Sequence, residues 1–335
     1  MTDKSGKRAG AVRGWLLTAG VALLALLLAT HGAGAVRQIV AEVGWQAVLV
    51  IVAHLPVTFL ATIGWQVLLP PDRRPSLPFL FRLRLIKEAV NALLPVAQVG
   101  GEVVRAKLAV RKGLSLAEST ASCVVDVLAG TVGLVLFVLT SLALAMATLR
   151  DPLLAQAGLA VVGVVALIAG SLFIAHKAGV GRRIGQFSQR WTAIPSRVGA
   201  LGDAFRDIGA RRKEIGASWA WHMAAWLAGA FETYVAMWAL GLHPTLVQAL
   251  IVEGLAQTAK VVGFAIPGAL GVQEGGYLLL GGALGLSPDQ ALALSLLRRL
   301  RELTLGALGL VLWRATRPEA PSLIRETPAT ATAAE

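Results

Sequence analysis

Long runs without Asp, Glu, Lys or Arg constrain this chain more than any other feature of its sequence. One run extends from Gly14 to Val36, and another extends from Val43 to Pro71. Both are longer than the stretch of about 20 apolar residues that a helix needs to cross the hydrocarbon core of a bilayer. Only 15% of the residues are charged, whereas soluble domains carry roughly 25%. These features exclude an ordinary soluble enzyme and, despite a net charge of +12, a nucleic-acid-binding protein or a disordered chain.

The sequence therefore predicts an all-α integral membrane protein with about six spanning helices. A cleaved signal peptide is the alternative for the first, because Ala33-Gly34-Ala35 resembles a processing site. The apolar run is long for a signal peptide, which favours a retained helix. Glu232 and a group of charges near residue 300 interrupt the last two spans. The predicted spans are 14–36, 43–71, 127–149, 152–176, 215–240 and 291–313.

The basic residues lie mainly in short segments between these runs, and they predict the topology. By the positive-inside rule, the N-terminus (1–13) and the strongly basic segment 177–214 are expected in the cytoplasm. Setting topology is the simpler role for 177–214, and binding anionic lipid headgroups is the alternative. Residues 14–313 then form one membrane domain, and 314–335 a disordered cytoplasmic tail rich in Pro, Thr and Ala.

Two further segments are apolar but are broken by proline and glycine. In each, a proline lies seven positions before a glutamate. Such residues interrupt the helical hydrogen-bond ladder, so the chain can turn at membrane depth where protein covers the backbone. We therefore expect two re-entrant hairpins. The residues expected to form them are Pro95, Gly100, Gly101, Pro267, Gly268, Gly271 and Gly275.

The two broken segments also resemble each other. At a constant offset of 172, positions 95–126 and 267–298 share 8 identities, where composition alone gives roughly three. The predicted topology opens the first hairpin from the cytoplasm and the second from outside. This is the arrangement of inverted-repeat transporters, in which broken helices line a substrate site. The alternative is that both hairpins only pack the helix bundle.

Several ionisable residues fall within the predicted membrane region, where charge is costly unless it is paired or hydrated. Arg298 and Glu302 are four positions apart, so they share one helix face. Glu253 and Lys260 are seven apart and share a face as well. Both a substrate role and structural ion pairing remain open for these charges. The candidate substrate-binding residues are Asn91, Glu102, Arg105, Asp126, Gln273, Glu274, Arg298, Arg301 and Glu302.

No pattern in the sequence indicates a metal or a cofactor. The single cysteine, Cys123, excludes an internal disulfide and a cysteine-based metal site, and the five histidines show no ligand spacing. A phosphate-binding Gly-x4-Gly-Lys-Ser/Thr motif is absent. The scattered carboxylates form no catalytic constellation, so an intramembrane enzyme is the weakest hypothesis.

The stretch from Ile266 to Gly275 resembles the signature hairpin of the lysylphosphatidylglycerol synthase transmembrane-region family, which are flippase-like membrane proteins. Asn91, Pro95 and the Gly100-Gly101-Glu102 triplet with Arg105 are similar to an earlier motif of that family. The chain differs from the usual pattern at two positions, with Ala269 in place of Gly and Gln273 in place of Arg. This version is similar to the subgroup associated with hopanoid biosynthesis.

The resemblance implies a lipid-handling protein of the bacterial inner membrane. Only the short tail 314–335 follows the last predicted span. It leaves no room for the soluble domain that transfers aminoacyl groups in other members, so no enzyme activity is expected. The first hypothesis is a transporter that moves or presents a lipid, a hopanoid or its precursor. The second is an accessory subunit that holds lipid-biosynthesis enzymes at the membrane through the basic segment 177–214.

Overall fold

The computed structural model describes residues 43–94, 100–149, 195–263 and 269–316, together with a few single positions outside these ranges. Every regular element within these residues is a helix. The all-α class predicted from the sequence is therefore confirmed for the described part of the chain.

A break at His54 divides the first described helix in two. α2 covers Ala47–Ala53, after a short 3-10 helix, and α3 covers Leu55–Gln66. Pro56 lies in the first turn of α3. It has no N–H to donate to the preceding turn, so the helical hydrogen-bond ladder stops there. The break places His54 near the middle of the apolar stretch Gly44–Gln66.

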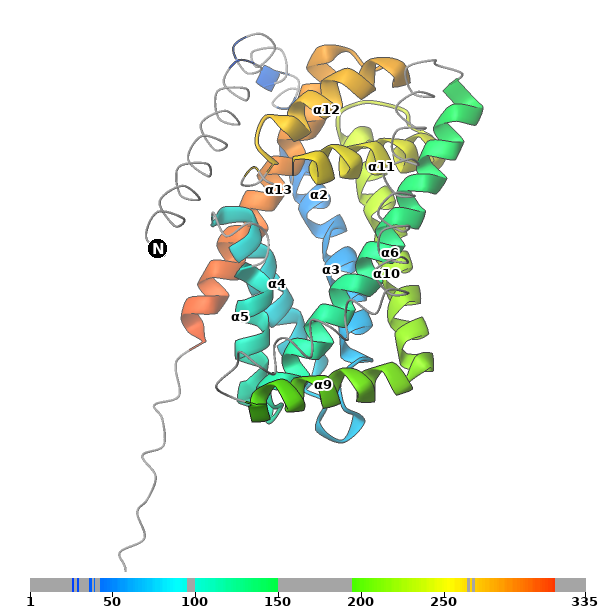
Figure 1. Ribbon diagram of the computed structural model, residues 1–335. Helices are drawn as coiled ribbons and strands as arrows, with labels where there is room; N and C mark the ends of the chain where they lie inside the picture. The colour runs from blue at the N-terminus through cyan, green and yellow to red at the C-terminus, as the bar shows by residue number, and fades with distance from the viewer. Residues whose placement is uncertain are drawn as a thin grey trace, which may run out of the picture.

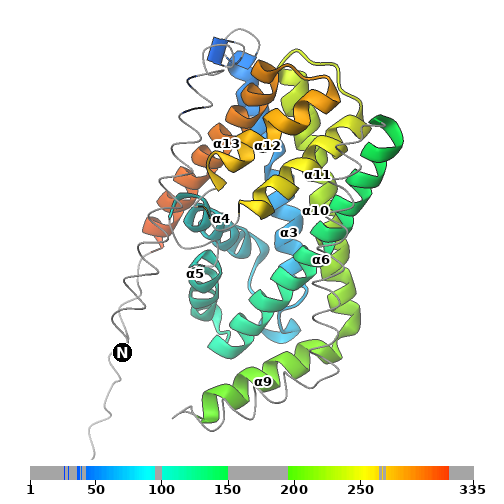
Figure 2. The same ribbon diagram turned by 45° about the horizontal axis from the view of Figure 1, so that its top comes forward.

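The segment in which the first hairpin is expected contains α4 (Leu77–Leu93) and α5 (Gly100–Ala109). α4 ends at Leu94, whose extended backbone (φ −109°, ψ 144°) is the conformation favoured before a proline. The two helices lie side by side in both orientations (Figures 1 and 2). α5 has 10 residues and is therefore about 15 Å long, half the thickness of a bilayer core.

A 3-10 turn and a glycine join α5 to the long helix α6 (Leu116–Leu149). The turn, η4 (Val110–Lys112), ends at Gly113, whose φ of +88° is in the left-handed region that favours glycine. Ser115 then caps α6 reciprocally with Glu118. The Ser115 hydroxyl accepts from the Glu118 N–H at 3.1 Å, and the Glu118 carboxylate accepts from the Ser115 N–H at 2.8 Å.

Helix α9 (Pro195–Ala210) lies across one end of the bundle, beyond the ends of α5 and α10 (Figure 2). It buries Ala204 and Ile208 in a small apolar cluster with residues of α6. α10 (Arg212–Ala239) follows directly and runs along α3 and α6. Of the segment predicted to be cytoplasmic, the described residues thus form an amphipathic helix and the first turn of the next one.

The second half of the chain repeats the order of elements seen in the first. α11 (Leu246–Val262) is followed by α12 (Val272–Gly281), a 3-10 turn η6 (Gly282–Leu284) and α13 (Pro288–Ala315). The turn again ends at a glycine with positive φ, Gly285 at +78°. A serine and a residue three positions later again form a reciprocal cap at the start of the long helix.

The lengths of these elements also agree. α4 and α11 both have 17 residues, α5 and α12 both have 10, and the two 3-10 turns both have 3. The starts of α5, η4 and α6 precede the starts of α12, η6 and α13 by one constant offset, 172. This is the offset at which the sequence resembles itself. An inverted orientation of the two halves stays a prediction.

Glycines allow the helices of the bundle to approach closely. A Cβ atom at Gly309 of α13 would lie 2.4 Å from the main-chain oxygen of Leu85 in α4. A Cβ at Gly254 of α11 would lie 2.2 Å from the Cβ of Ser141 in α6. Such small-residue contacts are typical of helix packing in membranes, where association depends on close van der Waals contact. α13 runs along α4 over much of its length (Figure 1).

Two stretches of the described chain are long and apolar enough to cross a membrane, Gly44–Gln66 and Leu116–Thr148. The second begins earlier than the predicted span 127–149, because the capped helix α6 starts at Leu116. The predicted span 291–313 falls within α13, and 215–240 extends one residue past the end of α10. The span 152–176 and nearly all of 14–36 lie outside the described residues. A total of about six spanning helices stays a prediction.

Candidate functional site

Charged side chains gather inside the bundle in two networks, and Asp126 of α6 is the centre of the first. Its side chain is 1% exposed. It accepts hydrogen bonds from Arg84 of α4 at 3.2 Å and from Arg105 of α5 at 2.7 Å. The Nε2 atom of His222 in α10 lies 2.8 Å from its other oxygen. One carboxylate thus joins four helices.

The first network extends from Asp126 towards the end of the hairpin. Arg105 is also 2.6 Å from Glu102, which in turn lies 2.9 Å from Lys87. Lys87 and Glu102 are 17% and 19% exposed, whereas Arg105 is fully buried. The network therefore has a buried base and an accessible end, which lies between the C-terminal half of α4 and the first turn of α5. The first network comprises Arg84, Lys87, Glu88, Glu102, Arg105 and Asp126.

An aromatic side chain covers the buried base of this network. The guanidinium of Arg105 lies 4.3 Å from the ring centroid of Trp65 in α3. The indole N–H of Trp65 donates to the hydroxyl of Ser122 at 3.2 Å. A cation over an indole face is stabilised most when both are shielded from water. Trp65 therefore holds Arg105 in place alongside its ion pair with Asp126.

The second network is built around arginines of α13. Arg301 is 2.9 Å from Glu232 of α10, and both contact the Nδ1 atom of His54. Arg298 pairs with Glu253 of α11. These arginines and carboxylates are at most 6% exposed. The break before Pro56 is what brings the His54 side chain to this point.

Neutral side chains donate to and accept from the buried ion pair between Glu253 of α11 and Arg298 of α13. Thr233 donates to Glu253 at 2.5 Å and accepts from Arg298 at 2.7 Å. Gln257 donates to the second oxygen of Glu253 at 2.7 Å. A buried ion pair is tolerated when its remaining donors and acceptors are satisfied in this way.

The second network also has an accessible end. Lys260 lies 2.6 Å from Glu302, and Arg299 bridges Glu302 at 3.0 Å and Glu274 at 2.8 Å. Glu274 also accepts from the N–H of Gly271 at 2.7 Å, which caps α12. Lys260 is 35% exposed and Glu302 is 13% exposed. The second network comprises Glu232, Glu253, Lys260, Glu274, Arg298, Arg299, Arg301 and Glu302, with His54.

The two networks approach each other across α2–α3 and α4. Thr58 donates to Glu88 of the first network at 3.2 Å. It lies one turn after His54 of the second network, so the two side chains share a helix face. At the end of α4, Leu93 packs against Gly306, one turn beyond Glu302. The accessible ends of both networks therefore lie near the C-terminal end of α4.

The candidate residues predicted from the sequence divide between these networks. Glu102, Arg105 and Asp126 belong to the first, and Glu274, Arg298, Arg301 and Glu302 belong to the second. Asn91 instead accepts a hydrogen bond from the N–H of Gly101 at 2.8 Å, which joins α4 to α5. Gln273 is 3% exposed.

Two sets of charges that share a helix face take partners on other helices in the structure. Arg298 and Glu302 share a face of α13, but Arg298 pairs with Glu253 and Glu302 pairs with Lys260. The side chains of α11 and α13 reach one another, so that each of these charges meets an opposite charge on the other helix. Asp126 and Arg298, which are equivalent at the repeat offset, lie in different networks.

The residues expected to form the hairpins have different roles in the structure. Gly271, with φ of +76°, lies at the start of α12, where the left-handed conformation favours glycine. Gly100 and Gly101 lie inside α5, and Gly275 lies inside α12. A Cβ at Gly101 would be 2.3 Å from the main-chain oxygen of Lys87, so that glycine permits close packing of the hairpin helices. Pro95, Pro267 and Gly268 lie outside the described residues.

Several members of the networks were not predicted as site residues. Glu232 interrupts a run otherwise free of charge, which was a usable signal. The two histidines lie in apolar helices where they resemble ordinary buried residues. The helix α4 contains Arg84, Lys87 and Glu88, and in the sequence these charges interrupt an otherwise apolar segment. The residues missed from the candidate list are His54, Arg84, Lys87, Glu88, His222, Glu232 and Arg299, together with Glu253 and Lys260, which the sequence had shown only as charges in the membrane region.

Among the residues that the structure describes, no group of three or more His, Cys, Asp or Glu side chains is placed to hold a metal ion. The networks instead combine basic and acidic side chains in nearly equal numbers. Chemically, such an arrangement can hold helices together, bind polar groups, or exchange one ion pair for another.

The sequence matches the family described as the lysylphosphatidylglycerol synthase TM region over residues 14–309. The chain belongs to this family. It is therefore a membrane protein of lipid metabolism. A comparison with curated proteins finds no match, and a comparison with solved structures finds none either.

Membership of the lysylphosphatidylglycerol synthase TM region family changes the meaning of the buried networks. Both networks lie within the matched residues of a transmembrane region. Charges at membrane depth are rare and face the bundle interior, where they pair or mark a path for a polar group. The accessible ends near α4 are consequently the first place to look for contact with a lipid headgroup.

Proposed function

We propose that this protein moves a membrane lipid between the two leaflets of a bacterial inner membrane. The substrate class in this proposal is a hopanoid or a hopanoid precursor. The role is one of transport, without covalent chemistry on the lipid, and the N- and C-termini face the cytoplasm.

The observation that carries the proposal is the recurrence of one unit in both halves of the chain. In each half, a 17-residue helix is followed by a 10-residue helix and a long capped helix. In each half, a glutamate in the first turn of the short helix belongs to a charge network. Broken helices in equivalent positions of two halves are typical of transporters with inverted repeats, in which the substrate binds between them.

In this mechanism the accessible ends of the networks contact the lipid headgroup while its hydrocarbon part stays in the bilayer. The short helices α5 and α12 are too short to cross the core. Rearrangement of these helices around the paired charges would open the headgroup path to one leaflet and then to the other. The buried bases of the networks keep the rest of the bundle together during this motion.

A leaflet-specific lipid assay tests the proposal directly. The distribution of each lipid class between the leaflets is measured in cells with the gene, without it, and with the gene restored. We expect one lipid class to accumulate in the leaflet of its synthesis when the gene is absent. An unchanged distribution of every lipid class would refute transport.

Variants at the accessible ends connect the assay to the site. Glu102→Gln and Glu302→Gln each remove one charge from an accessible ion pair. Loss of one charge-assisted hydrogen bond, about 1.5 kcal/mol, predicts a roughly tenfold slower movement. Glu118→Gln is the matched control, because Glu118 pairs with Arg73 on an exposed surface and glutamine can keep its cap of α6. Restored cells with this variant should resemble wild type.

A second candidate function is a scaffold for lipid-biosynthesis enzymes, and the surface at the junction of α9 and α10 favours it. Arg212 and Lys213 are exposed there. Arg211 is not part of that surface, because it donates to the main-chain oxygens of Leu68 at 2.9 Å and Leu69 at 3.4 Å. Loss of copurifying enzymes in an Arg212→Ser, Lys213→Ser variant, with lipid distribution unchanged, would favour this role over transport.

A further inference from the structure

Every cation in the two networks is paired with a carboxylate. The first network contains three basic and three acidic side chains, and the second contains four of each. Each network therefore has no net charge when His54 and His222 are neutral. The cation–carboxylate contacts are Arg84–Asp126, Lys87–Glu102, Arg105–Asp126, Lys260–Glu302, Arg298–Glu253, Arg299–Glu274 and Arg301–Glu232.

Helices α12 and α13 carry three uncharged side chains with unused hydrogen-bonding capacity. Among the described residues, the side-chain oxygens of Gln273, Tyr277 and Ser295 are buried without a hydrogen-bond partner. The exposed fractions of these side chains are 3%, 4% and 0%. Buried polar atoms are nearly always partnered in folded proteins, so unpartnered ones require an explanation. Some arginine Nε atoms also lack a hydrogen bond, but those guanidinium groups are already ion-paired through another nitrogen.

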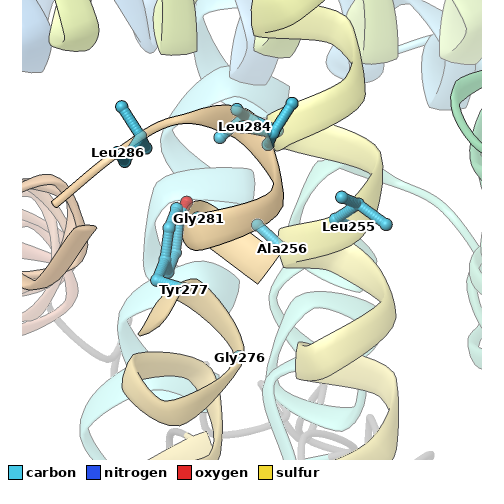
Figure 3. A pocket seen from close by; sticks show the side chains of 8 residues that line it. Leu255, Ala256, Gly276, Tyr277, Gly281, Leu284 and Leu286 are labelled. Carbon is cyan, nitrogen blue, oxygen red and sulfur yellow. The ribbon is translucent and has the colours of Figure 1, made fainter. Parts of the chain in front are cut away.

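Two of these groups lie one turn apart on α12, the short helix of the second hairpin. Figure 3 shows the Tyr277 ring on the wall of a cavity of about 10 Å³, with its hydroxyl oxygen beside Gly281. Leu255 and Ala256 of α11 line the opposite side (Figure 3). That volume is about the room for one water. A headgroup would therefore reach these atoms only when α12 moves away from its neighbours.

We propose that the transported lipid has an uncharged headgroup that bears hydroxyl groups, and that Gln273, Tyr277 and Ser295 bind it. This inference rests on the proposed transport function and names the chemistry of its substrate. Hydroxyl groups both donate and accept, so they match an amide oxygen and two hydroxyls. They also leave every ion pair of the networks intact.

A charged headgroup fits this site poorly. An anionic phosphate would need a cation that is not already held by a carboxylate, and breaking a buried pair leaves the carboxylate uncompensated. A zwitterionic headgroup would have to break pairs of both signs. A polyhydroxylated headgroup needs neither change, because the side chains of Gln273, Tyr277 and Ser295 are neutral.

The test uses the full chain reconstituted into phosphatidylcholine vesicles that contain a trace of fluorescent lipid. Three probes share one acyl-labelled diacylglycerol backbone and differ only in the headgroup, which is glucosyl, phosphocholine or phosphoglycerol. Quenching of the outer leaflet reports the rate of movement. We expect the glucosyl lipid to move at least about tenfold faster than the other two. Equal or faster movement of either phospholipid would overturn the headgroup assignment while supporting transport. Movement of none of the three would also overturn the headgroup assignment, whereas failure of transport itself is read from an unchanged leaflet distribution of lipids in cells.

Two variants at Gln273 test whether this side chain helps to bind the headgroup. Gln273→Arg adds a cation without a carboxylate partner, so we expect the phosphoglycerol lipid to gain movement. Gln273→Met is similar in size but has no acceptor, so we expect slower movement of the glucosyl lipid and no gain for the phosphoglycerol lipid. Each variant is first shown to be monodisperse in detergent. If both variants keep the wild-type preference among the three lipids, Gln273 does not bind the headgroup.

Discussion

Replacing Asp126 by asparagine tests whether the first network holds the helices together. Asparagine keeps the size of the side chain and removes its charge. Arg105 would retain Glu102 at 2.6 Å, but Arg84 would retain only its hydrogen bond to the main-chain oxygen of Ala61 at 2.8 Å and the longer contact to Glu88 at 3.9 Å. The change therefore leaves one guanidinium, itself 6% exposed, without a close carboxylate.

The expected loss follows from that geometry. Removing one partner of a buried ion pair costs about 3–5 kcal/mol. We expect about 3 kcal/mol for Asp126→Asn, at the low end of that range, because one of the two arginines keeps a second carboxylate. The free energy of unfolding is measured in mixed detergent micelles by denaturant titration, with tryptophan fluorescence as the probe.

Two controls separate loss of the ion pair from general damage. Asp203→Asn makes the same chemical change in an exposed pair with Arg206, where the carboxylate is 68% exposed and little effect is expected. Adding Arg84→Met to Asp126→Asn removes the uncompensated charge and should recover part of the stability. If Asp126→Asn destabilises the protein no more than Asp203→Asn, then the buried charges do not hold these helices.

Three further variants test other parts of the fold. Gly309→Ala should lower the free energy of unfolding by about 1–3 kcal/mol, because the new Cβ meets a main-chain oxygen of α4 at 2.4 Å. The control is Gly202→Ala in α9, whose Cβ meets nothing within 4 Å, so it should be neutral or stabilising. A neutral Gly309→Ala would contradict the close α4–α13 contact. Arg211→Met should destabilise the protein by about 1–3 kcal/mol through loss of charged hydrogen bonds to the end of α3, while the exposed Arg212→Met should have little effect. Ser287→Ala should lower the free energy of unfolding by about 1 kcal/mol by removing the cap of α13. Thermal unfolding in detergent measures all three variants. Equal midpoints for Arg211→Met and Arg212→Met would refute the role of Arg211 at the end of α3.

The arrangement of charges explains why the protein can place so many ionisable groups in one membrane region. Each network contains pairs between different helices, and these pairs form only when the helices assemble. His222 and Trp65 then fix Asp126 and Arg105, respectively. A bundle of this kind combines a stable base with accessible ends that can exchange partners.

Much of the fold was predictable because its signals are local. Glycine at positive φ and serine caps recur in the structure at the offset of 172 that the sequence itself shows, and each acts on its own turn of helix. That the chain is a membrane protein was equally predictable, because the low content of charged residues is a property of the whole sequence. Glu102, Arg105 and Asp126 were identified for the same reason, as charges inside apolar surroundings.

The tertiary structure alone decided which charges meet. Spacing placed Arg298 and Glu302 on one helix face, and the tertiary structure pairs Arg298 with Glu253 and Glu302 with Lys260. Residues 42 or more positions apart in sequence form these contacts, and local periodicity has no information on them. The sequence determined that charges lie in the membrane region, because burial of a charge is a property of its own segment. Only the packing of helices determined that they balance, because an ion pair is a property of two segments brought together.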